Sequence, residues 1–229
     1  MMRSLIVAVC VLFFPCALHA QIDRMVNNAI KQVTLSDATV SAGLKETLRL
    51  GIQNAVQSFS QGKGYAIGMP DKLQGLQQAL RAVGFGPKID AFILGMNKVA
   101  QKLTPSAGNM FLRALENTNF SDAKKIMQGS DTAATEYFKD KTYGQLFESL
   151  RPLVSAKMKE AGVLDKYNEL VAGYRSLPLI GKLSNFDITQ YVTDKALSGM
   201  FLAVGQQERT IRNDPEAQVT GLLQQVFGK

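Results

Sequence analysis

Apolar side chains recur at spacings of three and four residues along most of the chain, which is the period of an amphipathic α-helix. The clearest stretch follows Ser36, a residue type that favours the start of a helix. No segment alternates apolar and polar residues as a half-buried β-strand does. The pattern therefore predicts an all-α fold. The apolar face of this first stretch is formed by Val40, Leu44, Leu48, Ile52, Val56 and Phe59.

Glycine, proline and helix-capping residues divide the periodic pattern into about nine or ten helices. The segment 177–186, which contains Pro178 and Gly181, is the one substantial loop and a candidate hinge. We expect residues 21–229 to fold as a single-domain helical bundle with no sheet. The predicted helices occupy residues 36–59, 71–83, 87–103, 104–115, 121–128, 131–141, 142–161, 163–175, 187–211 and 214–227.

The first 20 residues have the three zones of a secretory signal peptide. Arg3 supplies the positive flank, Leu5–Phe14 is an unbroken apolar run of ten residues, and Pro15 ends it. Because a membrane-spanning helix needs about 20 apolar residues, this run is too short to be an anchor. We expect cleavage between Ala20 and Gln21, a periplasmic or secreted protein, and no transmembrane insertion.

The cleavage site also decides which reactive side chains remain. The only histidine, His19, and both cysteines, Cys10 and Cys16, lie within the first 20 residues. In an alternative interpretation Cys16 is lipidated, although the bulky residues 13–15 stand where that processing prefers small ones. Cleavage after Ala20 leaves 209 residues without histidine, cysteine or tryptophan.

Without histidine and cysteine, the common catalytic and metal-binding arrangements are excluded. Histidine is the usual general base and the commonest metal ligand, and cysteine is the usual thiolate nucleophile and zinc ligand. No disulfide can form, so core packing alone must stabilise the exported chain. The residue set favours a non-enzymatic protein with no catalytic residue, metal or cofactor.

Positive charge is concentrated in the first half of the expected mature chain. Residues 21–115 contain 11 basic and 5 acidic side chains, whereas residues 116–229 contain 14 of each. Two pairs of like charges lie four residues apart, so each pair shares a helix face at a small energetic cost. These pairs, Lys45 with Arg49 and Lys98 with Lys102, are the candidate anion-binding residues on a basic surface.

Five segments spread along the chain carry a family resemblance: Leu35–Ala38, Gly43–Glu46, Ser121–Phe138, Tyr191–Phe201 and Ile211–Gly228. In this order they resemble the bacterial domain-of-unknown-function family numbered 4197, over nearly the whole expected mature chain. The resemblance implies an exported, helical bacterial protein. It implies no activity, cofactor or catalytic residue.

Three functional hypotheses follow. The first is a non-enzymatic protein that binds or scaffolds an anionic component of the envelope, either a lipid or a polymer. The second is a carrier that holds a small apolar ligand or lipid between its helices, lined by methionine and glycine. The third is a hydrolase of envelope polysaccharide that uses paired carboxylates such as Glu46 and Asp90. The export signal and the lack of an aromatic–basic motif argue against nucleic acid, and the oligomeric state stays undetermined.

Overall fold

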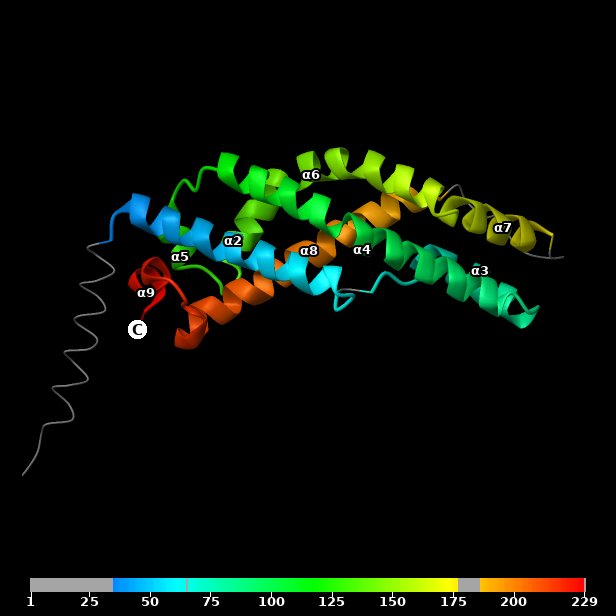
Figure 1. Ribbon diagram of the computed structural model, residues 1–229, viewed down its shortest axis with the longest axis horizontal. Helices are drawn as coiled ribbons and strands as arrows, with labels where there is room; N and C mark the ends of the chain where they lie inside the picture. The colour runs from blue at the N-terminus through cyan, green and yellow to red at the C-terminus, as the bar shows by residue number, and fades with distance from the viewer. Residues whose placement is uncertain (1–34, 65, 177–185, 229) are drawn as a thin grey trace, which may run out of the picture. The chain divides into compact units, whose positions relative to one another are not determined.

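Every regular element in the described part of the chain is a helix (Figure 1), which confirms the predicted all-α class. The computed structural model describes residues 35–64, 66–176 and 186–228. The predicted signal peptide, with its cleavage site at Ala20 and Gln21, lies outside these ranges, as does nearly all of the predicted loop at 177–186.

Within these ranges there are eight α-helices, so the prediction of nine or ten was slightly too high. All of them belong to one compact unit, Asp37–Gly228. Two short 3-10 helices occupy Asp71–Leu73 and Pro215–Ala217. The α-helices are α2 (Asp37–Ser60), α3 (Gln74–Ala82), α4 (Gly86–Asn117), α5 (Ala123–Met127), α6 (Ala133–Glu160), α7 (Val163–Arg175), α8 (Ile188–Asn213) and α9 (Gly221–Phe227).

Two predicted helix boundaries are wrong, because α4 continues through Pro105 and α6 continues through Thr142. Threonine favours a helix start when its hydroxyl caps a backbone N–H, but here each hydroxyl bonds back into its own helix. Thr104 Oγ1 donates to the Ala100 carbonyl at 3.0 Å, and Thr142 Oγ1 donates to the Phe138 carbonyl at 2.7 Å. Both threonines are buried, so tertiary packing holds the two halves of each helix in line.

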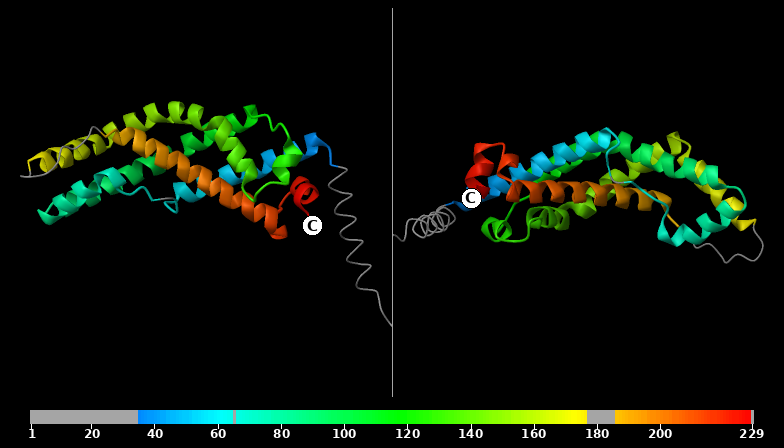
Figure 2. Two further views of the ribbon diagram at one scale, coloured as in Figure 1. Left: turned by 180° about the vertical axis from the view of Figure 1, so that it is seen from behind. Right: turned by 90° about the horizontal axis from the view of Figure 1, so that it is seen from below.

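Four long helices, α2, α4, α6 and α8, form the centre of the unit. Helix α2 packs along α8 and α4, and α6 packs along the same two helices (Figure 2). Helices α3 and α7 pack against each other and against α4, while α5 and α9 pack on α2. Close approach requires glycine at two contacts: a Cβ on Gly108 would overlap Val56, and one on Gly43 would lie 2.7 Å from Val226.

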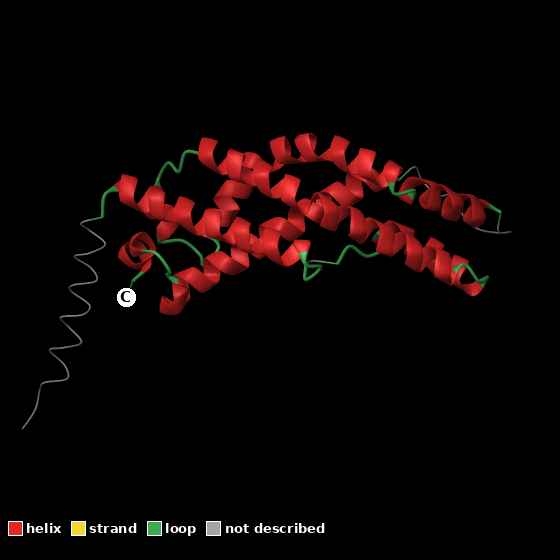
Figure 3. Ribbon diagram, viewed as in Figure 1, coloured by secondary structure: helices red, strands yellow, loops and turns green. Residues whose placement is uncertain are grey.

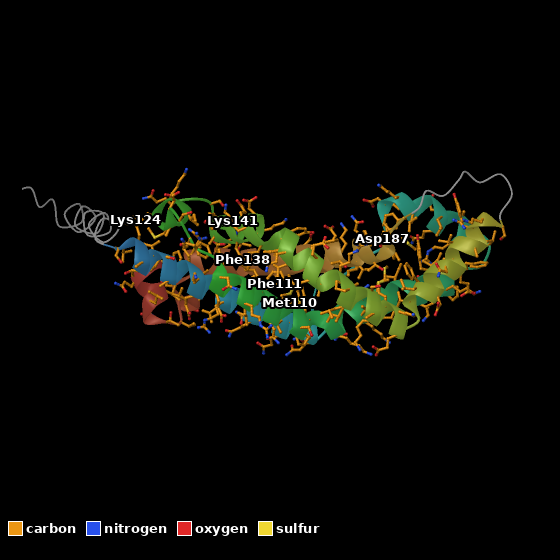
Figure 4. All side chains as sticks on the ribbon, turned by 90° about the horizontal axis from the view of Figure 1, so that it is seen from above. Met110, Phe111, Lys124, Phe138, Lys141 and Asp187 are labelled. Carbon is orange, nitrogen blue, oxygen red and sulfur yellow. The ribbon has the colours of Figure 1, made fainter. Side chains whose placement is uncertain are left out.

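The aromatic centre of the core joins three of these helices. Phe111 of α4, Phe138 of α6 and Phe201 of α8 are buried together, and Figure 4 shows the first two side by side. The Phe201 ring centroid lies 4.8 Å from that of Phe111 and 5.7 Å from that of Phe138. Aromatic rings of this size each remove a large apolar area from water, so the three rings help to hold α4, α6 and α8 together.

One buried ion pair connects helix ends that are distant in sequence. The Glu208 side chain of α8 is fully buried and accepts hydrogen bonds from the backbone N–H groups of Ala134 at 3.0 Å and Thr135 at 2.7 Å. It also accepts from Thr135 Oγ1 at 2.6 Å and from Arg212 Nε at 2.9 Å. Because Thr132 makes no side-chain cap, Glu208 supplies from another helix the carboxylate that the start of α6 needs.

Arg212 extends this connection to two further helices. Its Nη1 donates to the Met127 carbonyl at 2.7 Å and its Nη2 to the Ile126 carbonyl at 3.3 Å, both at the end of α5. The guanidinium also lies 5.4 Å from the centre of the Phe227 ring of α9. Through Arg212 and Glu208, α8 therefore binds the end of α5, the start of α6 and the face of α9.

We expect Arg212→Met to lower the free energy of unfolding by about 3 kcal/mol, because it leaves the buried Glu208 carboxylate without its counter-ion. The matched control is Arg209→Met on the same helix, where a 65% exposed side chain lies 3.9 Å from Asp131. That control should cost less than about 1 kcal/mol. Urea unfolding followed by circular dichroism measures both values, and equal losses would contradict the structural role of Arg212.

The start of α8 depends on Asp187. Its Oδ1 accepts from the Gln190 backbone N–H and its Oδ2 from Arg151 Nη2, both at 2.8 Å. The hydrogen bond from Gln190 and then the contact with Arg151 hold the pKa of Asp187 below its ordinary value. Since the folded-state pKa is lowered, this stabilisation is present above the unfolded pKa of about 3.9 and is lost as pH falls through the folded value.

Replacing Asp187 by alanine should therefore cost about 1 kcal/mol of stability at pH 7, the usual value of a helix cap. The penalty should begin to shrink as the pH falls below about 4, where the carboxylate of the unfolded chain takes up a proton, and should disappear below the lower pKa of the folded carboxylate. Asp140→Ala, an exposed change within α6, is the control and should show neither effect. Urea midpoints measured between pH 2 and pH 7 test this, and a penalty independent of pH would refute it.

Candidate ligand-binding site

A cavity of about 300 Å³ lies among α2, α4, α6, α8 and the connection between α2 and α3, which Figure 3 shows as loop. We call it the central cavity. It lies within the size range of small-molecule sites, at the small end. Most of its wall is apolar: Phe59, Ala66, Ile67, Leu94, Ala100, Leu103, Ala107, Leu150, Val154, Ala196 and Met200.

Asn97 of α4 holds the loop that forms one side of this cavity. Its Oδ1 accepts from the Ile67 backbone N–H at 2.8 Å, and its Nδ2 donates to the Ile67 carbonyl at 2.8 Å and to the Ile93 carbonyl at 2.9 Å. One side chain thus satisfies both backbone groups of a buried loop residue. These two hydrogen bonds hold Ile67 in the wall of the cavity.

The other amide and hydroxyl side chains around the cavity are also engaged within the protein. Gln101 Nε2 donates to the Ser60 carbonyl at the end of α2 at 2.9 Å, and Thr104 bonds within its own helix. The remaining polar side chains of the wall are those of Lys98 and Lys195. Neither ammonium group has an ion pair or hydrogen bond within the part of the chain that the structure describes.

A second hollow, of about 450 Å³, lies between α6 and α8, and we call it the α6–α8 groove. Lys195 and Gly199 line both the groove and the central cavity, so the two hollows share one turn of α8. Eight of its twelve lining residues have polar or charged side chains. The groove is lined by Thr132, Thr135, Glu136, Lys139, Lys195, Ser198, Gly199, Phe201, Leu202, Gly205, Gln206 and Arg209.

Two of the lysines that line the groove lie over tyrosine rings. Lys139 Nζ lies 5.7 Å from the centre of the Tyr143 ring, and Lys195 Nζ lies 5.6 Å from the centre of the Tyr191 ring. Burial, and then the hydrogen bond that the Tyr143 hydroxyl donates to Asp194, raise the pKa of Tyr143 to about 12. Tyr143 is therefore neutral near pH 7, and its hydroxyl engages the nearby carboxylate of Asp194.

The structure separates the four residues predicted as an anion site. Lys45 Nζ donates to the Glu116 carbonyl at 3.1 Å, so it caps the end of α4. Arg49 forms an ion pair of 2.6 Å with Glu46, and the hydrogen bond that Arg49 donates to that carboxylate raises the pKa of Arg49. Both cations of the first pair thus have partners within the protein.

The second pair lies elsewhere on the same helix. Lys102 precedes Glu116 by 14 residues, which corresponds to about 21 Å along α4. Its charge helps to lower the pKa of Glu160, after the larger effect of Lys157. Lys98 lines the central cavity and Lys102 does not. Of the four predicted cations, Lys98 lines the central cavity, and the other three line neither the cavity nor the α6–α8 groove.

The carboxylates considered for hydrolysis are not brought together. Glu46 pairs with Arg49 on α2, while Asp90 pairs with Arg81 at 2.5 Å near the start of α4. Lys45, next to Glu46, contacts the opposite end of α4, about 39 Å from Asp90 along that helix. Among the described residues, no group of three or more His, Cys, Asp or Glu side chains could hold a metal ion.

Sequence reasoning did not find Asn97, Lys139 or Lys195. An asparagine inside a helix is unfavourable, so Asn97 carried a weak signal of a side chain bonded elsewhere. Lys139 and Lys195 stand far apart in the half of the chain whose charges balance, and no spacing connects them. Only the packing of α6 on α8 brings them to one groove.

The helices and their hollow define an all-α protein with an apolar cavity among four long helices. A family model described as "Protein of unknown function (DUF4197)" matches residues 22–228, so the chain belongs to that family. The resemblance predicted from the five segments is thereby confirmed. No curated protein and no solved structure matches the chain. None of the helices that the structure describes is long and apolar enough to cross a membrane.

Proposed function

We propose that this protein is a non-enzymatic binding protein for a small amphiphile, with the apolar body in the central cavity and an anionic group at its mouth. The observation that carries the proposal is the composition of the cavity wall. Its amides and its threonine hydroxyl already bond to the protein, which leaves apolar surface and the ammonium groups of Lys98 and Lys195.

The cavity is large enough for one hydrocarbon chain or a small ring system, and too small for a large ligand. Each methylene group moved from water into such a wall stabilises the complex by about 0.8 kcal/mol. An anionic group on the ligand that lies beside an ammonium group strengthens binding further and fixes the orientation of the ligand. A fatty acid or another single-chain lipid anion has both features.

This proposal combines two of the hypotheses drawn from the sequence. An amphiphile of this kind is both an anionic component of a bacterial envelope and an apolar ligand held between helices. Export across the cytoplasmic membrane, as proposed from residues 1–20, would bring the protein to that material. The third hypothesis gains no support, because Glu46 and Asp90 each pair with an arginine.

Filling the cavity tests the site directly. Ala196→Leu adds three carbon atoms to the cavity wall, and we expect it to weaken binding of a fluorescent long-chain fatty acid at least about tenfold. The control is Ala203→Leu, seven residues along the same face of α8, at a half-buried position that does not line the cavity. Fluorescence titration of both purified variants gives the two affinities.

The outcomes of this titration are distinct. Unchanged affinity in Ala196→Leu, or equal losses in both variants, would show that the ligand lies elsewhere. A wild-type protein that binds no fatty acid at micromolar concentration would refute the proposed function. Urea unfolding of both variants verifies that each remains folded.

The anionic end is tested by comparing two lysines of one helix face. Lys98→Gln should weaken fatty-acid binding by about threefold to tenfold, because it removes a charge at the cavity. Lys102→Gln, one helical turn away and outside the cavity wall, should change the affinity less than about twofold. The corresponding fatty alcohol should bind both variants equally, and a loss shared by acid and alcohol would contradict a charge effect.

A further inference from the structure

The α6–α8 groove and the central cavity share two lining residues, Lys195 and Gly199. A ligand whose apolar chain occupies the cavity and whose charged end lies at Lys195 therefore has a second hollow, of about 450 Å³, on the other side of that lysine. A fatty acid, which ends at its carboxylate, leaves that groove unused.

Two lysines contribute positive charge to the groove. Lys139 of α6 and Lys195 of α8 form no ion pair within the described ranges, and both rest on tyrosine rings. Two nearby carboxylates accept hydrogen bonds from neutral hydroxyls, Asp194 from Tyr143 and Glu136 from Thr132 Oγ1 at 2.6 Å, and both keep their negative charge. Neither forms an ion pair with Lys139 or Lys195, so two ammonium groups from different helices line one groove without a direct ion-pair partner among the described residues.

The cation at the far end of the groove, Arg209, is paired and lies far from Lys195. Arg209 lies 14 residues beyond Lys195 on α8, which corresponds to about 21 Å along the helix. Its guanidinium lies 3.9 Å from Asp131. A single headgroup that contacts Lys195 does not reach Arg209 as well. Lys195 is the lysine of the groove that also lines the cavity.

We infer that the ligand is a phosphate-bearing single-chain lipid, whose headgroup extends from the cavity into the groove and binds Lys139 and Lys195. This inference rests on the proposed function and names its ligand class. A terminal phosphate carries between one and two negative charges near pH 7 and offers several acceptor oxygens. It matches two ammonium groups better than a carboxylate does, and its linker supplies the length needed to reach Lys139.

Two ligands of equal chain length separate this inference from the proposed function. Lysophosphatidic acid carries a glycerol phosphate headgroup, and the matching fatty acid carries only a carboxylate. Isothermal titration calorimetry with the purified wild-type protein should show that lysophosphatidic acid binds about tenfold more tightly. Lys195→Gln should weaken the binding of both ligands, because Lys195 lines both hollows.

The decisive variant is Lys139→Gln, since Lys139 lines the groove and not the cavity. It should lower the affinity for lysophosphatidic acid about fivefold or more and change that for the fatty acid less than about twofold. Lys139→Arg, which keeps the positive charge, should retain most of the wild-type affinity for lysophosphatidic acid. Arg209→Gln, in the same groove, is the matched control and should leave both affinities within about twofold.

Each result has one meaning. If the fatty acid binds but lysophosphatidic acid binds no more tightly, or if Lys139→Gln affects both ligands equally, the headgroup inference is overturned and the cavity proposal stands. If neither ligand binds the wild-type protein, the proposed function is overturned together with the inference. Lys139 is exposed, so its replacement should leave the urea midpoint unchanged, which excludes unfolding as the cause of a lost affinity.

Discussion

The buried pair of Glu208 and Arg212 is the interaction on which the arrangement of helices depends. Removing two charges from water is costly, and the cost is offset only when every donor and acceptor finds a partner. Glu208 finds its partners at the start of α6, and Arg212 finds its partners at the end of α5 and on the Phe227 ring. No buried side-chain nitrogen or oxygen among the described residues lacks a partner. A shift of α6 by one turn along α8 would break this network, so the pair sets their register.

That register also builds the site. Three side-chain contacts join α6 to α8 or to its N-cap, and their residue numbers rise along α6 while they fall along α8. They pair Thr135 with Glu208, Tyr143 with Asp194, and Arg151 with Asp187. The two helices are therefore antiparallel, and their alignment brings Lys139 to the groove that Lys195 also lines. The same alignment places Leu150 and Val154 of α6 against the central cavity. A structural ion pair at one end thus determines the position of ligand-facing groups further along the same two helices.

Much of the fold could be predicted from the sequence, because an amphipathic helix leaves a periodic signal in its own residues. The all-α class and the positions of α2, α3 and α7 follow from this signal within a few residues. The boundaries expected at Thr104 and Thr142 were wrong because a threonine hydroxyl can cap a helix or bond back into it. The competition is decided by burial against neighbouring helices. Of the predicted anion-binding residues, Lys98 lies at the cavity, while Lys45 and Arg49 bind partners that spacing does not reveal in advance.

The sequence by itself determined the helical class, the family and the poverty of catalytic side chains beyond residue 20, because these depend on composition and local order. Tertiary structure alone decided which charged side chains have no ion-pair partner within the described part of the protein. Residues 21–115 carry the excess of positive charge, yet Lys139 and Lys195, which line the groove, come from the balanced half of the chain. The physical reason is that a charge is available to a ligand only when folding gives it no partner. Pairing depends on contacts between helices that are remote in sequence.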